Sequence, residues 1–196
     1  MTARALSALA ALLPLLSGGC ATPGAEVTGS PLVGQPVDVV GEELGGRAVR
    51  VSGATGQVRV VDVWATWCEA CGEELAALAR LQGDDGRRGL TVYALSIDED
   101  RAQVAAYVAG LPAAAAVGIL WDQGGARNAE RLPLERLPTT LVVDRDGLIR
   151  HVHQGFGPGS AARLAAEVEA LLGPAPVSSP VAPLPAVPPP AGPGRP

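Results

Sequence analysis

The segment Trp64-Ala-Thr-Trp-Cys68-Glu-Ala-Cys71-Gly72 carries two cysteines separated by two residues. It follows an apolar run typical of a strand and opens a stretch typical of a helix. At this spacing both side chains lie on one helix face, with Cβ atoms roughly 5–6 Å apart, so a small adjustment permits a disulfide. Cys68 then lies in the first turn, where free backbone N–H groups and the helix dipole stabilise a thiolate. The pair therefore indicates thiol–disulfide exchange.

Two other interpretations of this pair are weaker. A zinc site needs two further ligands, but the one remaining cysteine is Cys20 and the two histidines, His151 and His153, are distant in sequence. A purely structural disulfide at this spacing closes a loop too short to constrain the unfolded chain much. The histidines stand two apart on a predicted strand and so share one face, which we expect to be partly solvated. We expect neither a metal nor a cofactor.

Length and composition limit the remaining classes. A chain of 196 residues has room for one ordinary domain with flanking segments. An apolar content of 47% supports a real core. A net charge of −5 gives no sign of the basic surface with which proteins bind nucleic acid. We therefore expect one folded domain with a hydrophobic core and no nucleic-acid partner.

The N-terminal residues predict export. Arg4 precedes an apolar stretch, residues 5–16, that is too short to span a bilayer. The following Leu15-Leu-Ser-Gly-Gly-Cys20 resembles a bacterial lipoprotein signal, although Ser17 stands where that signal usually has leucine. We expect residues 1–19 to be the signal peptide and Cys20 to be lipidated, which anchors the domain on the extracytoplasmic, periplasmic side of a membrane. An ordinary secretory signal with an unmodified Cys20, or an uncleaved anchor, stays open.

Both ends of the remaining chain are predicted to be unfolded. Residues 20–30 are small and turn-forming and are typical of a flexible tether. In residues 174–196, ten of 23 positions are proline, which predicts an extended, disordered spacer. The foldable domain is therefore expected over residues 31–173.

Within this domain, apolar runs typical of strands alternate with helical spacing. Strands are predicted over 37–40, 48–51, 58–64, 90–97, 117–121, 139–143 and 148–154. Helices are predicted over 69–81, 101–109, 126–132 and 160–172, with Asp98 or Asp100 capping the second helix and Ser160 the last. This order predicts an α/β domain with a central mixed β-sheet and helices on both faces.

Three motifs in order resemble the thioredoxin superfamily, and within it the membrane-tethered extracytoplasmic branch of TlpA, ResA and the cytochrome c maturation thioredoxins. The resemblance spans roughly residues 31–173 and implies the thioredoxin fold. The motifs are Val61-Asp-Val-Trp-Ala-Thr-Trp-Cys-Glu-Ala-Cys71, Leu137-Pro-Thr-Thr-Leu-Val-Val-Asp144, and Asp146-Gly-Leu-Ile-Arg150 leading to Gly155.

The resemblance adds roles around the dithiol. We expect Cys68 to attack a substrate disulfide and Cys71 to resolve the mixed disulfide. Asp62 interrupts an apolar strand and matches the buried aspartate that assists proton transfer with the second cysteine in thioredoxins; an edge or solvent-facing position stays open. Glu74 lies one helical turn after Cys71 and matches an active-site glutamate of ResA-like proteins; a solvated position beside Glu73 also stays open.

The second motif implies a substrate-docking surface. Pro138 matches a cis-proline that lies against the dithiol in this family, and the backbone before it, at Leu137, pairs with substrate as an added strand. Trp67 is expected on the rim around Cys68. One residue departs from the family pattern, because Ala70 stands where proline usually precedes the second cysteine. That departure leaves the direction of electron flow open.

The resemblance implies an extracytoplasmic thiol–disulfide oxidoreductase that reduces specific envelope proteins, for example in cytochrome c maturation, and is regenerated by a membrane dithiol donor. A disulfide-forming oxidase with the same site is one alternative. A non-catalytic thioredoxin-fold scaffold that binds partners is another. Peroxidase activity of the peroxiredoxin type is less well supported, because the proline–threonine pattern before the attacking cysteine is missing.

Overall fold

The computed structural model describes residues 25–26, 29–132 and 134–174. The predicted signal peptide, the lipidation site at Cys20 and nearly all of the proline-rich tail lie outside the described residues. In the described part, no helix has the length and apolar character needed to cross a bilayer.

The described residues form one mixed sheet of eight strands in the order β1-β8-β7-β4-β5-β6-β2-β3. The central strand β4 pairs in parallel with β5 and antiparallel with β7, and β5 pairs in parallel with β6. This arrangement confirms the predicted α/β class. The strands are β1 (Ala25–Glu26), β2 (Asp38–Glu43), β3 (Ala48–Ser52), β4 (Val58–Trp64), β5 (Leu90–Ser96), β6 (Gly118–Trp121), β7 (Thr139–Val143) and β8 (Ile149–Gln154).

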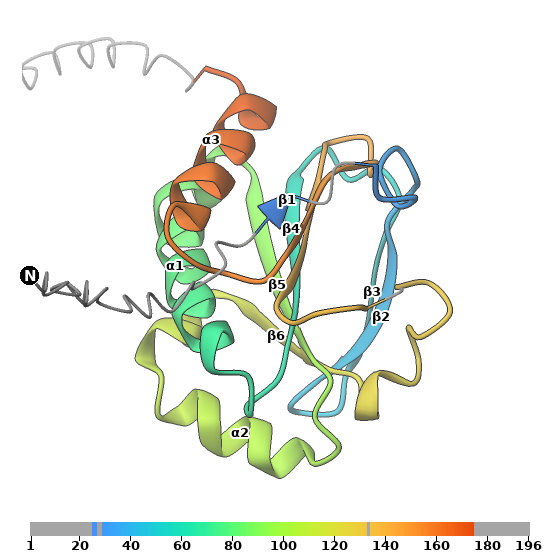
Figure 1. Cartoon of the computed structure of the whole chain (residues 1–196), viewed down its shortest axis with the longest axis vertical. Coiled ribbons are helices and arrows are strands. Elements are labelled where there is room, and N and C mark those ends of the chain that lie inside the picture. Colours follow the sequence, from blue (N-terminus) through green and yellow to red (C-terminus); the bar gives the residue numbers. More distant parts are fainter. Residues whose placement is uncertain (1–24, 27–28, 133, 175–196) are drawn as a thin grey trace, which may run out of the picture.

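The three α-helices of the described residues pack on one face of this sheet, so the prediction of helices on both faces is wrong. Figure 1 shows α1 and α3 side by side, with α2 at one end of the sheet. The chain steps from β4 to β5 to β6 in one direction, and right-handed crossovers therefore place α1 and α2 on the same face. The core on this face joins apolar side chains of the strands to Leu75, Val104 and Leu164. The helices are α1 (Glu69–Asp85), α2 (Arg101–Ala109) and α3 (Ser160–Leu172), with the 3-10 turns η1 (Gly86–Arg88), η2 (Pro112–Ala116) and η3 (Gln123–Gly125).

The opposite face is covered mainly by irregular chain. Its core contains Val61 and Val63 of β4, and Leu32, Leu132 and Leu134 pack on it from the segment before β2 and from the connection between η3 and β7. The helix predicted over 126–132 is wrong, because these residues form turns.

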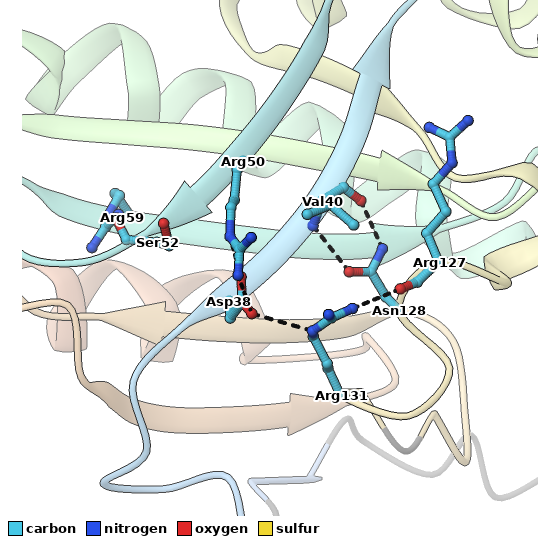
Figure 2. Close-up of polar contacts among 8 residues, drawn as sticks. All are labelled: Asp38, Val40, Arg50, Ser52, Arg59, Arg127, Asn128 and Arg131. Atoms are coloured by element: carbon cyan, nitrogen blue, oxygen red, sulfur yellow. Dashed lines mark hydrogen bonds and ion pairs between the residues drawn. The ribbon is translucent and has the colours of Figure 1, made fainter.

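Asn128 explains these turns. Its side-chain amide accepts a hydrogen bond from Val40 N–H (3.0 Å) and donates one to Val40 C=O (2.7 Å), as Figure 2 shows. The amide thus pairs with β2 where β6 does not reach, since β6 pairs only with Glu42 and Glu43. Arg131 in the same connection contacts Asp38 of β2 (3.2 Å). A helix would point these side chains elsewhere, and side chain–backbone bonds of this kind compete with helix formation.

Of the predicted helix caps, the one at Asp100 is confirmed and the one at Ser160 is wrong. Asp100 caps α2, because its carboxylate accepts a hydrogen bond from Ala102 N–H (2.8 Å), whereas Asp98 does not cap this helix. Ser160 is not the cap of α3 but its first residue; the capping position is Gly159, with φ of +85°. The Ser160 hydroxyl instead accepts from Gly157 N–H (3.2 Å).

Candidate active site

The two cysteines lie where β4 passes into α1. The strand is buried along its whole length, and a turn closed by Cys68 N–H and Ala65 C=O (3.1 Å) follows it. Cys68 is the N-cap residue of α1, and Cys71 lies in the first helical turn. The two sulfurs are 2.00 Å apart, in a disulfide with a Cα–Cα distance of 5.4 Å. The predicted pairing of Cys68 with Cys71 is therefore confirmed.

The two sulfurs differ in exposure. Cys71 is fully buried, whereas Cys68 is half-buried. A substrate can therefore reach Cys68 first, as the position at the helix start predicts. No hydrogen bond from the Cys68 side chain caps α1, so the backbone N–H groups of the first turn remain directed at this end of the helix.

Two buried carboxyl groups lie on the same side of the sheet as α1. Asp62 of β4 is fully buried, and Glu74 of α1 is 1% exposed. Thr140 of β7 lies opposite Asp62 in the sheet, and its hydroxyl donates a hydrogen bond to Glu74 Oε1 (2.5 Å). The solvated alternatives for Asp62 and Glu74 are therefore wrong. The sequence analysis did not predict the contact between Thr140 and Glu74. The position of Thr140 two residues after Pro138, in the second motif, was the one signal that it lies near the site.

Burial controls the protonation of this carboxyl pair. It raises the pKa of Glu74 to about 7, although the hydrogen bond from Thr140 opposes the shift. Burial also raises the pKa of Asp62 well above its usual value, and the neighbouring charge of Glu74 raises it further. Both Asp62 oxygens and Glu74 Oε2 lack hydrogen-bond partners among the described residues. The pair can therefore hold a proton at neutral pH, and Glu74 lies one helical turn from Cys71.

A groove opens beside Cys68. It has a volume of about 430 Å³, and its lining includes Trp67, Ile97, Leu134 and Leu137. Trp67 is 68% exposed, which fits the predicted position on the rim. The groove can accept an extended polypeptide with apolar side chains next to its cysteine.

The first two sequence motifs meet at this groove, through Trp67, Cys68 and Leu137. The peptide bond between Leu137 and Pro138 is cis, as expected from the resemblance. The Pro138 carbonyl accepts a hydrogen bond from Gly155 N–H (2.7 Å), which joins the second motif to the third. Gly155 has a φ of +77°, a conformation that favours glycine.

The histidine pair lies on β8, within the third motif, and His153 is paired across the sheet with Thr140 of the second motif. His153 is 5% exposed and its Nε2 lies 2.7 Å from Glu167 Oε2, so the predicted solvated face is wrong for this residue. His151 is half-buried, with Nδ1 at 3.7 Å from Glu167 Oε1. Within the described ranges, no group of three or more His, Cys, Asp or Glu side chains is placed to hold a metal ion.

Sequence comparison assigns the chain to a family. The model of the AhpC/TSA family matches residues 33–152, which is more than half of the chain. The thiol-disulfide oxidoreductase ResA of Halalkalibacterium halodurans is 27% identical over 123 residues, covering 62% of this chain and 67% of the relative. The thiol:disulfide interchange protein DsbE of Allochromatium vinosum is 31% identical over 126 residues, covering 60% of this chain and 61% of the relative. The match thus spans about two thirds of these relatives.

Solved structures share the fold. A crystal structure described as a DsbE-type thiol:disulfide interchange protein from Chlorobium tepidum has a TM-score of 0.65 and 26% identity, covering 72% of this chain and 98% of that one. StoA from Bacillus subtilis has a TM-score of 0.55 at 16% identity, covering 69% of this chain and 99% of that one, and supports the fold alone. The chain therefore belongs to the AhpC/TSA family, with the thioredoxin fold and the cysteine pair of thiol–disulfide oxidoreductases of the TlpA/ResA type.

Proposed function

We propose that this protein is an extracytoplasmic reductase that transfers electrons from its Cys68–Cys71 dithiol to disulfides of specific envelope proteins. The observation that carries the proposal is the difference between the two sulfurs. Cys68 is half-buried at the start of α1 and opens on the groove, whereas Cys71 is fully buried behind it. That arrangement suits one sulfur for attack and the other for resolution.

The reduction proceeds in two exchanges. The Cys68 thiolate attacks one substrate sulfur, the substrate S–S bond breaks, and the second substrate sulfur leaves and takes up a proton. The Cys71 thiolate then attacks Cys68 in the mixed disulfide and releases the first substrate sulfur, which is also protonated. Two electrons pass to the substrate and the Cys68–Cys71 disulfide forms. A membrane dithiol donor then reduces this disulfide and completes the cycle.

The carboxyl pair has a part in the second exchange. Cys71 must lose its proton before it attacks, and it is buried away from solvent. Glu74 lies one helical turn after Cys71 on α1, and the pKa values of Glu74 and of its neighbour Asp62 are raised, that of Glu74 to about 7. We assign to them the acceptance of the Cys71 proton. Pro138 and Leu137 present the backbone to which the substrate docks.

The reduction potential tests the direction of electron flow. We expect equilibration of the full chain with glutathione or dithiothreitol buffers to give a value nearer to about −270 mV than to about −120 mV, the range between thioredoxin and a strong oxidase. A value near the oxidising end would assign the protein as a disulfide-forming oxidase. Failure to exchange with either buffer would instead favour a scaffold. The Ala70→Pro variant provides a matched comparison, because proline removes one N–H group from the start of α1.

We propose further that Cys20 is lipidated and anchors the domain to the membrane. The short apolar segment before Cys20 and the small residues around it support this proposal. Mass spectrometry of the mature N-terminus is expected to show an acylated cysteine, and Cys20→Ala should move the protein from the membrane to the soluble fraction. An unmodified Cys20 at the mature N-terminus, or in a chain that keeps residues 1–19, would contradict the anchor.

A further inference from the structure

A buried carboxylate from the segment after β5 holds the turn that precedes Cys68. Asp98 follows the end of β5 and is 2% exposed. The backbone N–H of Thr66 donates to Asp98 Oδ2 (3.0 Å) and Oδ1 (3.2 Å), and the Thr66 hydroxyl donates to Oδ1 (2.7 Å). The Ser96 hydroxyl donates to Oδ2 (2.7 Å). Both oxygens of this buried carboxylate are therefore bonded, as burial requires.

Asp98 is itself fixed to the sheet. Its backbone N–H donates to the Ser96 hydroxyl (3.1 Å). Its carbonyl accepts hydrogen bonds from Trp121 Nε1 of β6 (2.8 Å) and from Gly124 N–H (3.3 Å). The backbone of Asp98 is thus held by groups of β5, β6 and η3.

Helix α2 also contacts Thr66. Gln103 of α2 donates from Nε2 to the Thr66 hydroxyl (2.8 Å). The Thr66 hydroxyl therefore joins α2 to the segment after β5, because it accepts from Gln103 and donates to Asp98. No step of the exchange chemistry uses Asp98, Gln103 or the Thr66 hydroxyl.

The position of Thr66 bears directly on Cys68. Thr66 lies two residues before Cys68, inside the turn closed by Cys68 N–H and Ala65 C=O. The start of that turn is tied to β5 by the bond from Ile97 N–H to Trp64 C=O (3.0 Å). Between this bond and the start of α1, the Thr66 bonds to Asp98 attach the turn to the sheet. A reacting group on a turn keeps its geometry only where neighbouring residues hold it.

We propose that Thr66 and Asp98 are positioning residues that hold the Cys68 sulfur at the start of α1 and toward the groove. Gln103 supports them from α2. This inference rests on the proposed exchange chemistry at Cys68. It adds residues that act through the turn and touch neither the substrate nor the reacting sulfurs.

The Thr66→Val variant tests this inference, since valine keeps the size and branching of threonine but lacks the hydroxyl. The rate constant for reaction of the reduced full chain with 5,5′-dithiobis(2-nitrobenzoate) is measured between about pH 5 and pH 9, in a Cys20→Ala background so that only the dithiol reacts. We expect Thr66→Val to react about tenfold more slowly, because misplacement of a reacting group lowers its rate. The midpoint of the pH–rate curve should move upward as the sulfur leaves the helix N–H groups. Thr66→Ser, which keeps the hydroxyl, should stay within about twofold of the wild type.

Two further variants keep the test decisive. Thr91→Val removes a hydroxyl from the opposite end of β5, where it contacts Gln57 Oε1 (3.2 Å), and should leave rate and midpoint unchanged. Gln103→Met changes an exposed residue of α2, so we expect this variant to fold even if Thr66→Val does not. It should lower the rate about threefold. The inference is overturned if every variant of Thr66 and Gln103 that folds keeps the wild-type rate and midpoint, or if Thr66→Ser is as slow as Thr66→Val. A wild-type protein that does not react at all would overturn the proposed function itself.

Discussion

Cys68→Ser is expected to abolish disulfide reduction, and Cys71→Ser to accumulate a covalent complex with the substrate. Serine at position 68 cannot supply a thiolate, so the rate should fall by about three orders of magnitude or more, the scale seen when a nucleophile is lost. Cys71 cannot replace it, because its side chain is fully buried in the folded domain. In Cys71→Ser the attack by Cys68 is intact, but nothing resolves the mixed disulfide.

Two measurements distinguish these outcomes. Turnover is followed with a reducible protein disulfide, and the trapped complex is detected by its mass under non-reducing conditions. Cys20→Ser provides the matched control, because it removes a cysteine outside the dithiol and should retain full turnover in a soluble assay. Full turnover by Cys68→Ser would contradict the assigned nucleophile, and a trapped complex with that variant would reverse the roles of the two cysteines.

Glu74→Gln is expected to stabilise the oxidised protein at alkaline pH and to change little at acid pH. The pKa of Glu74 is raised from 4.5 to about 7 by burial, so the folded state binds this proton more tightly than the unfolded state. The corresponding stability is present below pH 4.5 and is lost as the pH rises through about 7. Above that range, the buried charge destabilises the wild type by about 3 kcal/mol, since each pKa unit is worth about 1.4 kcal/mol. Glutamine carries no charge and keeps an oxygen for the Thr140 hydroxyl.

The free energy of unfolding measured with denaturant at about pH 5 and about pH 8 checks this result. Glu73→Gln is the matched control, because Glu73 is the exposed neighbour on the same helix and its replacement should leave the pH dependence unchanged. If Glu74→Gln loses stability between the two pH values as steeply as Glu73→Gln does, Glu74 is not the group that titrates.

Helices and strands whose bounds depend on neighbouring residues in the sequence were predicted well. The bounds of β4, α2 and β7 agree with the predicted ranges, because a continuous apolar run, a cap at Asp100 and a turn at Asp144 are all readable from neighbouring residues. The disulfide between Cys68 and Cys71 was also predictable, since both cysteines lie in one helical turn.

Features that depend on distant partners were not predictable in this way. The turns at 126–132 replace a helix because Asn128 bonds to Val40, which lies 88 positions away. Burial of Glu74 depends on Thr140, 66 positions further along the chain. Asp98 looked like a helix cap from its local sequence, but its partner Thr66 lies 32 positions earlier. In each case a side chain meets a group that only the folded sheet brings near.

In this enzyme, the reacting groups and part of the groove lining come from different segments of the chain. The reacting sulfurs and the buried carboxyl groups lie on β4 and α1, whereas Leu134 and Leu137 of the groove come from the irregular connection between η3 and β7. Asn128 attaches one end of the connection to β2, and the bond between Gly155 and the Pro138 carbonyl attaches the other. Between these attachments, the described residues 129–132 and 134–137 lie outside the helices and strands. We therefore expect substitutions at Leu134 to change which partner the groove accepts, while the cysteine pair and its carboxyl groups stay in place.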